Sequence, residues 1–519
     1  MGEPPTRPGQ NRLHAAKLLG AAGALAVLGA LMVGNSMTKP VGRDEQMYCT
    51  AGVLLAQGHL PYLDFSYAAQ LPYHPLLCAA VFRATGTTHY LLHARIVSVA
   101  CNVLVMVLIV GIYVRVIGGG PLGAWLGIGG AGLYAFNPLV EYANGYAWNH
   151  DVVVMLVLAS LWLFPAGHTG RGATSWRVAG LGILLMLASG MRATTILVLP
   201  VFAAALHVRA KRSGMRTRSW ILPFGAGVAA GAAWPAWVAA QSPQALWINL
   251  VTLPRLYGRW LQGIGMTHNK AALTAQCLTT PGTLVLLALV VGLVTWAWRS
   301  RGTRQDELRV QFVMTVALII VFSLVALIPP TMWHQYWAVP VPFLVASLAF
   351  PLGCLARSKD PRRLQWGSGL VALAVLATLA SNPGAPLHVA AAADRTTWEP
   401  LRMHRLAREI AASVPAPRRV LTLTPLLALE GGCPIYRELS CGSILYRVAD
   451  QLTPAEREQT HTVGPVSLSD CVQARPASAI LVGVEDPRFA FLEAPLKDLA
   501  KPGWPRFEYT GGLTLYCRP

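Results

Sequence analysis

Two adjacent carboxylates, Asp44 and Glu45, stand directly after the first hydrophobic segment of the chain. They open a polar, proline-rich stretch that reaches to residue 75. An ionisable side chain at the edge of a membrane-spanning segment is costly to keep there and marks a functional site by default. A carboxylate in this position could act as a general base on a substrate whose reactive phosphate lies at the membrane surface. The stretch therefore favours chemistry on a lipid-linked substrate.

Positive charge for such a phosphate could come from four arginines expected on the same side of the membrane. A guanidinium group matches phosphate oxygens with its forked N–H donors. The same side chains could instead extend to lipid headgroups, as long basic residues commonly do. The four candidates are Arg95, Arg192, Arg255 and Arg259.

The composition is that of a membrane protein. Of the 519 residues, 54% are hydrophobic and 13% are charged, whereas a soluble domain is about one quarter charged. Apolar runs of roughly 20 residues, long enough to cross a bilayer as helices, recur along most of the chain. We expect a membrane all-α fold, a polytopic helical bundle of about eleven spans. The candidate spans are 17–36, 90–113, 121–138, 151–166, 177–190, 193–208, 219–240, 281–298, 311–328, 335–355 and 366–381.

The net charge of +19 indicates topology rather than a nucleic-acid partner. Basic residues gather in short loops near 209–218, 299–309 and 357–363, whereas a nucleic-acid groove would interleave them with exposed aromatic side chains. Such loops mark the cytoplasmic side of a membrane and could contact anionic lipid headgroups. They all fall inside if the N-terminus is cytoplasmic and 177–208 divides into two spans near Arg192. We expect a multi-pass inner (plasma) membrane protein whose first span is an uncleaved helix rather than a signal peptide.

Three substantial segments then fall on the outer side. The first outer loop, 37–89, has apolar residues at helical spacing over 45–57, and we expect helices lying along the membrane surface. The second outer loop is 241–280. The tail, 382–519, has β-type runs at 420–424, 478–484 and 513–517, and a capping sequence at 453–456 that should start a helix. We expect a transmembrane domain over 1–381 and a small extracytoplasmic α/β domain over 382–519.

Cysteines and histidines give weaker signals. Four cysteines in an extracytoplasmic tail could form two disulfides in any of three connectivities, and we expect Cys433–Cys441 with Cys471–Cys517. Histidines expected on the outer side have no helix-spaced ligand pattern, so ordinary polar roles are favoured over a metal site. These histidines are His59, His74, His150, His268 and His334. No cofactor is indicated with certainty, although a divalent metal held by Asp44 and a neighbouring acid stays open.

The first outer loop combines several short motifs, and others follow in the spans and the tail. Those of the loop are the Asp44-Glu45 pair, Tyr48, Gly58-x-x-Pro61-Tyr62-x-Asp64 and the proline-rich run. The later ones are Ala94-Arg95, Asn137-Pro138, Asp151, His334-x-Tyr336-x-x-x-Pro340-x-Pro342-Phe343, Leu421-Thr422-x-x-Pro425 and Leu515-Tyr516. Together they resemble the GT-C superfamily of membrane glycosyltransferases over most of the chain. The chain is most similar to the rhizobial lipopolysaccharide-core sugar transferases and, more distantly, to the aminoarabinose and protein O-mannosyl transferases.

The resemblance implies an inverting glycosyltransferase of the cell envelope with a GT-C-type bundle. It would move a sugar from a polyprenyl-phosphate donor to a hydroxyl of a glycan, lipid or protein on the outer face of the membrane. Asp44 matches the family's loop aspartate and would be the general base, and Asp151 matches its second acidic position. Glu45 and Asp64 would support the base or bind sugar hydroxyls. Further substrate-binding candidates are Tyr62, Gln70, His334 and Tyr336.

One departure from the family concerns phosphate binding. In the aminoarabinose transferases a lysine precedes the first-loop proline, whereas this chain has Gln70 two residues before Pro72. Another basic residue would have to take over.

Two other classes of function compete with transfer. A transporter or flippase for a lipid-linked sugar would place ionisable groups and broken helices near the bilayer midplane, often in inverted repeats. The acids here stand at span ends, and no repeat is evident. A scaffold subunit of an envelope-synthesis complex would not need Asp44 and Asp151. Transfer is therefore the favoured hypothesis, with the sugar and the acceptor undetermined.

Overall fold

The computed structural model describes residues 8–118, 120–164, 171–267, 269–299, 306–329 and 331–519. His268, a possible metal ligand, and Arg301 and Arg304 of one basic loop lie outside the described residues. The described chain is mainly helical, with a small sheet near its C-terminus.

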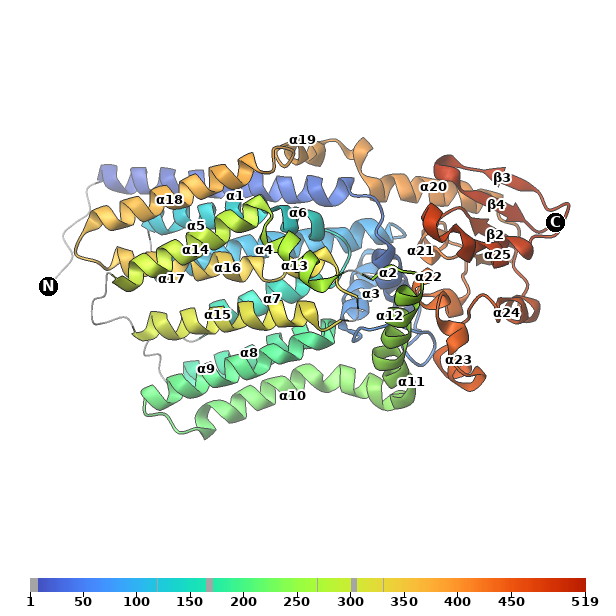
Figure 1. Cartoon of the computed structure of the whole chain (residues 1–519), viewed down its shortest axis with the longest axis horizontal. Coiled ribbons are helices and arrows are strands. Elements are labelled where there is room, and N and C mark those ends of the chain that lie inside the picture. Colours follow the sequence, from blue (N-terminus) through green and yellow to red (C-terminus); the bar gives the residue numbers. More distant parts are fainter. Residues whose placement is uncertain (1–7, 119, 165–170, 268, 300–305, 330) are drawn as a thin grey trace.

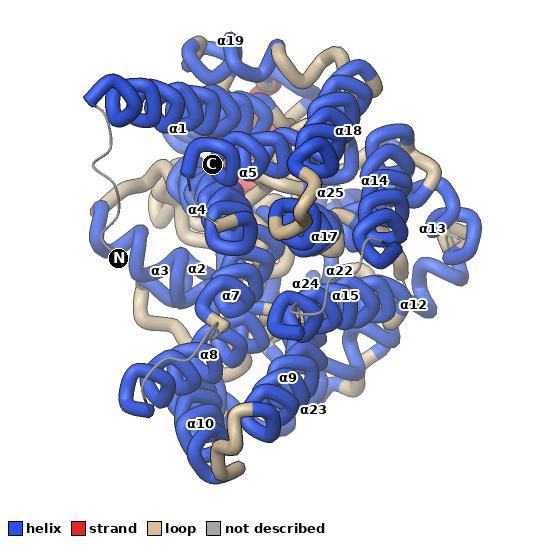
Figure 2. The backbone as a smooth tube through the Cα atoms, turned by 90° about the vertical axis from the view of Figure 1, so that its left-hand side faces the viewer, coloured by secondary structure: helices blue, strands red, loops and turns tan. Residues whose placement is uncertain are grey.

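Long apolar helices form the larger part of the molecule and run along its long axis (Figure 1). In the view along the bundle, α8, α9 and α10 lie at one edge and α1, α5 and α18 toward the other, with α7 and α15 between them (Figure 2). The helices of the bundle are α1 (Pro8–Thr38), α4 (Tyr90–Ile117), α5 (Gly120–Ala135), α7 (His150–Leu163), α8 (Arg171–Met191), α9 (Leu199–Arg212), α10 (Arg218–Gln241), α14 (Pro281–Arg299), α15 (Asp306–Leu327), the short consecutive pair α16 (Val341–Ser347) and α17 (Ala349–Ala356), and α18 (Pro361–Ala380).

Each of the expected spans contains one of these helices or a consecutive pair of them. By length and composition, seven helices of the described chain could cross a membrane, or eight if the bent pair Lys270–Leu278 and Pro281–Ala297 is one span. The apolar helical segments His150–Leu163 of α7 and Ser175–Met191 of α8 are shorter. The polytopic helical fold is confirmed, and the number of spans stays a prediction.

The expected break within 177–208 is present. Helix α8 ends at Met191, Arg192 has extended backbone angles (φ −141°, ψ 111°), and the 3₁₀ helix η1 (Ala193–Val198) leads into α9. The basic connections α9–α10 and α17–α18 lie at the end of the bundle nearest the N-terminus, and the tail lies beyond the opposite end (Figure 1). The two ends of the bundle therefore differ in charge as the sequence predicts.

The first outer loop contains two helices, α2 (Arg43–Ala56) and α3 (Tyr73–Thr85), at the end of the bundle that faces the tail (Figure 1). The short helix α6 (Pro138–Ala143) precedes α7. The second outer loop forms α11 (Pro243–Trp247), a turn of π-helix (Ile248–Thr252), α12 (Leu253–Gly263) and α13 (Lys270–Leu278). The helix expected over 45–57 is thus confirmed as α2.

The tail contains a four-stranded sheet in the order β1-β2-β4-β3, with β1 parallel to β2 and the other pairs antiparallel. Its strands are β1 (Val420–Leu421), β2 (Ala479–Val482), β3 (Arg506–Glu508) and β4 (Thr514–Cys517). The three expected strands are present, and α23 (Pro454–Thr460) begins with the expected capping box between Thr453 and Glu456. The other main helices of the tail are α19 (Leu387–Ala393), α20 (Glu399–Ser413), α21 (Pro425–Glu430), α22 (Ser443–Tyr446), α24 (Leu468–Ala474) and α25 (Ala494–Asp498).

The tail and the first outer loop share one hydrophobic core, in which Val53 and Phe82 pack with Leu427 and Leu515. A polar contact reinforces it at the start of α4. The buried carboxylate of Glu430, from α21, accepts a hydrogen bond from the backbone N–H of Leu91 at 2.8 Å. Its other oxygen contacts Nδ1 of His404 at 2.8 Å. Since the first N–H groups of a helix have no partner within it, the tail caps α4.

The expected disulfides are not formed. All four tail cysteines are free thiols, and the two members of each expected pair lie in different hydrophobic clusters. Cys441 packs with residues of the first outer loop and its thiol contacts the carbonyl of Ser66, whereas the thiol of Cys517 contacts the carbonyl of Ser413. Spacing along the chain could not reveal that these thiols serve separate packing contacts.

Candidate active site

Helix α2 presents Asp44 and Glu45 in its first turn. Adjacent residues of an α-helix point about 100° apart, so the two carboxylates enter different environments. Asp44 is partly exposed, whereas Glu45 is completely buried. Glu45 also accepts a hydrogen bond of 2.7 Å from the backbone N–H of Gly42 and so caps its own helix.

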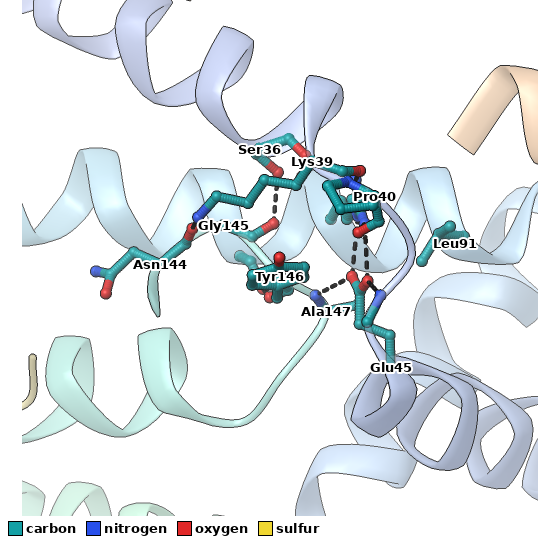
Figure 3. A network of polar contacts seen from close by, with 12 residues as sticks. Ser36, Lys39, Pro40, Glu45, Leu91, Asn144, Gly145, Tyr146 and Ala147 are labelled. Carbon is teal, nitrogen blue, oxygen red and sulfur yellow. Dashed lines mark hydrogen bonds and ion pairs between the residues drawn. The ribbon is translucent and has the colours of Figure 1, made fainter. Parts of the chain in front are cut away.

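Glu45 forms a buried ion pair with Arg95 of α4, and their partners come from three further segments (Figure 3). Arg95 donates to Glu45 at 2.9 and 2.7 Å, and its other N–H groups donate to the backbone carbonyls of Ser36, Lys39 and Pro40 at 2.8, 2.8 and 3.0 Å. Glu45 also accepts from the backbone N–H of Ala147 at 2.7 Å. The pair therefore joins the end of α1, the start of α2, α4 and the loop 144–149.

This geometry conflicts with the prediction that Arg95 binds a substrate phosphate. A guanidinium group has five N–H donors, and those of Arg95 are all directed to protein acceptors. A phosphate could bind only if several of these buried hydrogen bonds broke. Glu45 likewise has no access to a sugar hydroxyl, because its side chain is buried. Both residues position the loop that carries Asp44.

Asp151 is also used within the protein. It is buried in the first turn of α7, where its Oδ2 accepts a hydrogen bond of 2.9 Å from the backbone N–H of Gly145. Gly145 has a positive φ of 87°, and a side chain there would collide with Ser36. Within the described chain Asp151 makes no hydrogen bond or ion pair with Asp44. The structure thus gives Asp151 a role in holding the loop 144–149.

The charge of Asp44 acts on a group of tyrosines from four elements. Burial raises the pKa of Tyr48, on α2, well above its usual value; the charge of Asp44 raises it further and the charge of Arg192 lowers it. Burial also raises the pKa of Tyr142 and of Tyr257, with a smaller contribution from Asp44 in each case. Tyr336 is a fourth phenol within electrostatic range of Tyr48. Asp44 and Arg192 therefore act on the same phenol, that of Tyr48, from different elements.

The pKa of the Asp44 carboxyl is raised by burial, an effect that the charge of Arg43 partly offsets. The charge of Glu45 adds a smaller upward shift to the pKa of Asp44. A raised pKa makes the carboxylate a stronger base once it is ionised, which suits proton abstraction near neutral pH.

Arg192 is the predicted cation that lies in this group. Its guanidinium carbon lies 4.9 Å from the ring centre of Tyr336, and its Nη1 lies 3.3 Å from Nε2 of His150. No carboxylate in the described parts of the chain pairs with Arg192. An arginine with neutral partners keeps its full charge available for an anion.

Arg255 and Arg259 lie elsewhere. Both are exposed on α12, and the helical period puts each about 160° from Tyr257 around the helix axis. Tyr257 faces inward, where its hydroxyl contacts Nη1 of Arg447 at 3.4 Å. The two arginines therefore stand on the opposite face of α12 from the tyrosine group, which departs from their prediction as substrate ligands.

The tail contributes residues that the sequence did not single out. Arg447 has a side chain without exposed surface, and it donates to Glu485 at 3.1 Å. Arg43 approaches the same carboxylate at 3.5 Å. Both guanidinium groups lie over the ring of Phe489, that of Arg43 at 5.1 Å and that of Arg447 at 4.4 Å from its centre. These contacts attach the tail to the residue before Asp44, and no local pattern could have predicted them.

The remaining first-loop candidates shape the loop. The hydroxyl of Tyr62 donates to the backbone carbonyl of Gln70, and the Gln70 side chain accepts from Asn149 at 2.8 Å. Asp64 accepts from the backbone N–H of Leu60 at 2.7 Å. All three side chains thus have protein partners in the structure.

His334 and Tyr336, the candidates from the later motif, lie on η3 (His334–Trp337). The His334 ring packs edge-on against Tyr142, with 5.9 Å between ring centres. Both residues therefore lie at the tyrosine group. As for a metal, the described residues contain no cluster of three His, Cys, Asp or Glu side chains that could hold one.

Comparisons with known proteins bear on the fold. No family model matches the chain, and no curated protein matches it. Among solved structures, it is similar to ArnT from Cupriavidus metallidurans bound to undecaprenyl phosphate, with 13% identity, 98% of each chain covered and a TM-score of 0.62. The apo state of that protein gives 12% identity, 98% and 97% coverage and a TM-score of 0.58.

A second similar protein is the oligosaccharyltransferase of Archaeoglobus fulgidus tethered with an acceptor peptide. It has 12% identity and a TM-score of 0.53, with 96% of this chain and 74% of that chain covered. At these identities the likeness concerns the fold alone, and it confirms the expected GT-C fold.

Proposed function

On the premise of this GT-C fold, we propose that the protein is an inverting glycosyltransferase that uses a polyprenyl-phosphate sugar as donor. The observation that carries the proposal is that the opposite charges of Asp44 and Arg192 both act on the phenol of Tyr48. Sugar transfer from a phosphate needs a base for the acceptor hydroxyl and positive charge for the departing phosphate. Asp44 and Arg192 have these two properties, and both stand at the edge of the apolar bundle.

In the proposed reaction, Asp44 accepts the proton of the acceptor hydroxyl while that oxygen forms a bond to the anomeric carbon. The bond from the anomeric carbon to the phosphate oxygen breaks with inversion. The polyprenyl phosphate leaves with the electron pair of that bond. Arg192 stabilises the negative charge that develops on it, and a forked guanidinium is well suited to this task.

The tail would cover the acceptor side of the site. Arg447 of the tail contacts the hydroxyl of Tyr257. Arg43, the residue before Asp44, and Arg447 both contact the carboxylate of Glu485. Closure of the tail over α2 would exclude water, which otherwise competes with the acceptor for the sugar. The acceptor is an envelope glycan, lipid or protein, lipopolysaccharide being one case.

We place the site on the outer face of the inner membrane, with the N-terminus in the cytoplasm. The support is the position of the basic α9–α10 and α17–α18 connections at the end of the bundle away from the tail (Figure 1), together with the preference of such loops for the cytoplasm.

The proposal is tested by Asp44→Asn, which keeps the size of the side chain and removes the base. A strain lacking the protein would be complemented with this variant, and its envelope glycans compared by mass spectrometry. Purified protein would then be assayed with defined polyprenyl-phosphate sugars. We expect loss of the modification and of transfer, by a factor of at least about 10².

The matched control is Asp470→Asn, an exposed acid of the tail that should leave transfer unchanged. Normal transfer by a folded, inserted Asp44→Asn protein would contradict the proposal.

A further inference from the structure

His150 stands beside Arg192 and is absent from the catalytic roles described so far. Its Nε2 lies 3.3 Å from Nη1 of Arg192, and its ring stacks on that of Tyr336 with 6.2 Å between centres and 11° between planes. Trp148 packs edge-on against the same ring, with 5.9 Å between centres. His150 is only 7% exposed, so its ring is held in one place.

The contact with Arg192 determines the proton on the ring. A guanidinium group can only donate hydrogen bonds, so Nε2 must accept and carry no proton. The ring also hydrogen-bonds the backbone of Gln335, a bond that the remaining N–H at Nδ1 can donate to the carbonyl. His150 is therefore a neutral imidazole whose two nitrogens connect η3 to Arg192.

The neighbouring residue strengthens this connection. Asn149 donates from Nδ2 to the backbone carbonyl of Met191 at 2.8 Å and to the side chain of Gln70 at 2.8 Å. Two successive residues of the α7 start thus hold Met191 and Arg192, where the chain is extended between α8 and η1. The backbone and the guanidinium of Arg192 are both fixed from α7.

The neutrality of these partners distinguishes Arg192, which is partly exposed, from the buried arginines Arg95 and Arg447. Arg95 is paired with Glu45, and Arg447 with Glu485. A carboxylate in the place of His150 would orient Arg192 equally well but would cancel its charge. An imidazole and a phenol ring orient it while leaving its positive charge uncompensated.

We propose that His150 is a positioning residue that holds Arg192, uncompensated, in place to bind the phosphate of the lipid-linked donor. The proposal rests on the proposed function, because it assigns that phosphate to Arg192. It identifies the ligand of the His150–Arg192 pair as a polyprenyl phosphate group. His150 itself does not touch the reacting atoms.

The test is a double-mutant cycle with undecaprenyl phosphate as the probe, its affinity measured on the purified full-length protein in nanodiscs. His150→Phe keeps the stacking on Tyr336 and removes the acceptor, and we expect affinity to fall roughly tenfold. His150→Gln offers an oxygen near the position of Nε2 and should restore affinity to within about threefold. In the Arg192→Ala background, His150→Phe should cause no further loss.

Each outcome decides a different point. If Arg192→Ala binds undecaprenyl phosphate as the unmodified protein does, the phosphate assignment of the proposed function is wrong. If Arg192→Ala loses affinity but His150→Phe does not, the positioning role is wrong. The positioning role is also wrong if His150→Phe weakens binding as much in the Arg192→Ala background as in the unmodified protein. If His150→Phe does not fold, His150→Asn, whose amide is too short to reach Arg192, takes its place. In transfer assays His150→Phe should lower kcat/KM for the donor, because Arg192 both binds the phosphate and stabilises the charge that develops on it.

Discussion

The carboxylate of Glu45 and the guanidinium of Arg95, 50 residues apart in the chain, are joined by two hydrogen bonds of 2.9 and 2.7 Å with both side chains removed from solvent. Because Glu45 follows Asp44 directly, this pair sets the position of the proposed base relative to α4. Glu430 of the tail caps the same helix at the N–H of Leu91, four residues before Arg95. The base, the bundle and the tail therefore meet over one turn of α4.

Removal of one member of this pair should be costly. Arg95→Met leaves Glu45 as an uncompensated buried charge, and Glu45→Gln does the same to Arg95. Losing one partner of a buried ion pair costs about 3–5 kcal/mol. We expect lower thermal stability in detergent for either variant, together with loss of transfer, and a smaller loss of stability for the double variant Arg95→Met/Glu45→Gln. Single variants as stable as the unmodified protein would show that the pair is not the anchor of α2.

The raised pKa of Asp44 predicts the pH dependence of transfer. The base acts only when ionised, so the acid limb of kcat/KM should have its midpoint above about 3.9, the value of a free aspartate. Measurement of kcat/KM from acid to neutral pH, over the range in which the protein stays folded, would locate this limb. A midpoint at or below the free value would contradict burial of the carboxyl.

The same shift predicts an effect on stability. A carboxyl whose pKa is raised by folding makes the folded state less favourable once the pH exceeds the pKa of the unfolded chain. Asp44→Asn should therefore unfold at a higher temperature than the unmodified protein at neutral pH, and the difference should vanish as both states become protonated in acid. The comparison needs only thermal unfolding curves at several pH values. A lower midpoint for Asp44→Asn at neutral pH would argue against this cost.

The arginines can be ranked by their contribution to the affinity for the lipid-linked sugar donor. Arg192→Ala should weaken binding of undecaprenyl phosphate by roughly tenfold or more, because a hydrogen bond to a charged group is lost. Arg255→Ala and Arg259→Ala should change it by less than about threefold, since both residues stand on the far face of α12 from Tyr257. Titration of the three variants under the same salt conditions would check the ranking. Equal losses would indicate that α12 turns when the donor binds.

The cap that Glu430 provides predicts a link between tail and bundle. Glu430→Ala removes the acceptor of the Leu91 N–H, and loss of a helix cap costs about 1 kcal/mol. We expect faster hydrogen exchange at the start of α4 and earlier proteolytic release of the tail. Glu409→Ala, an exposed acid of α20, is the matched control. Unchanged exchange at 90–95 in the Glu430 variant would contradict the cap.

Much of the fold could be predicted from local patterns. Apolar runs predicted the positions of the bundle helices, the capping box at Thr453 predicted the start of α23, and β-type runs predicted β1, β2 and β4. The position of Asp44 at the end of the first span followed in the same way. These features depend on residues close together in the chain, so a single sequence is sufficient to predict them.

The roles of the charged residues depended on the tertiary structure. Arg95 and Arg192 look alike in the sequence. Arg95 is completely paired with Glu45 and backbone carbonyls, whereas the partners of Arg192 among the described residues are neutral. Asp151 accepts a hydrogen bond from Gly145, whereas its neighbour His150 contacts Arg192. The sequence by itself determined which segments are helices and where charge reaches the membrane edge. Only the packing of distant segments decided which charges are cancelled, because a charge is neutralised by whatever lies near it in space rather than in sequence.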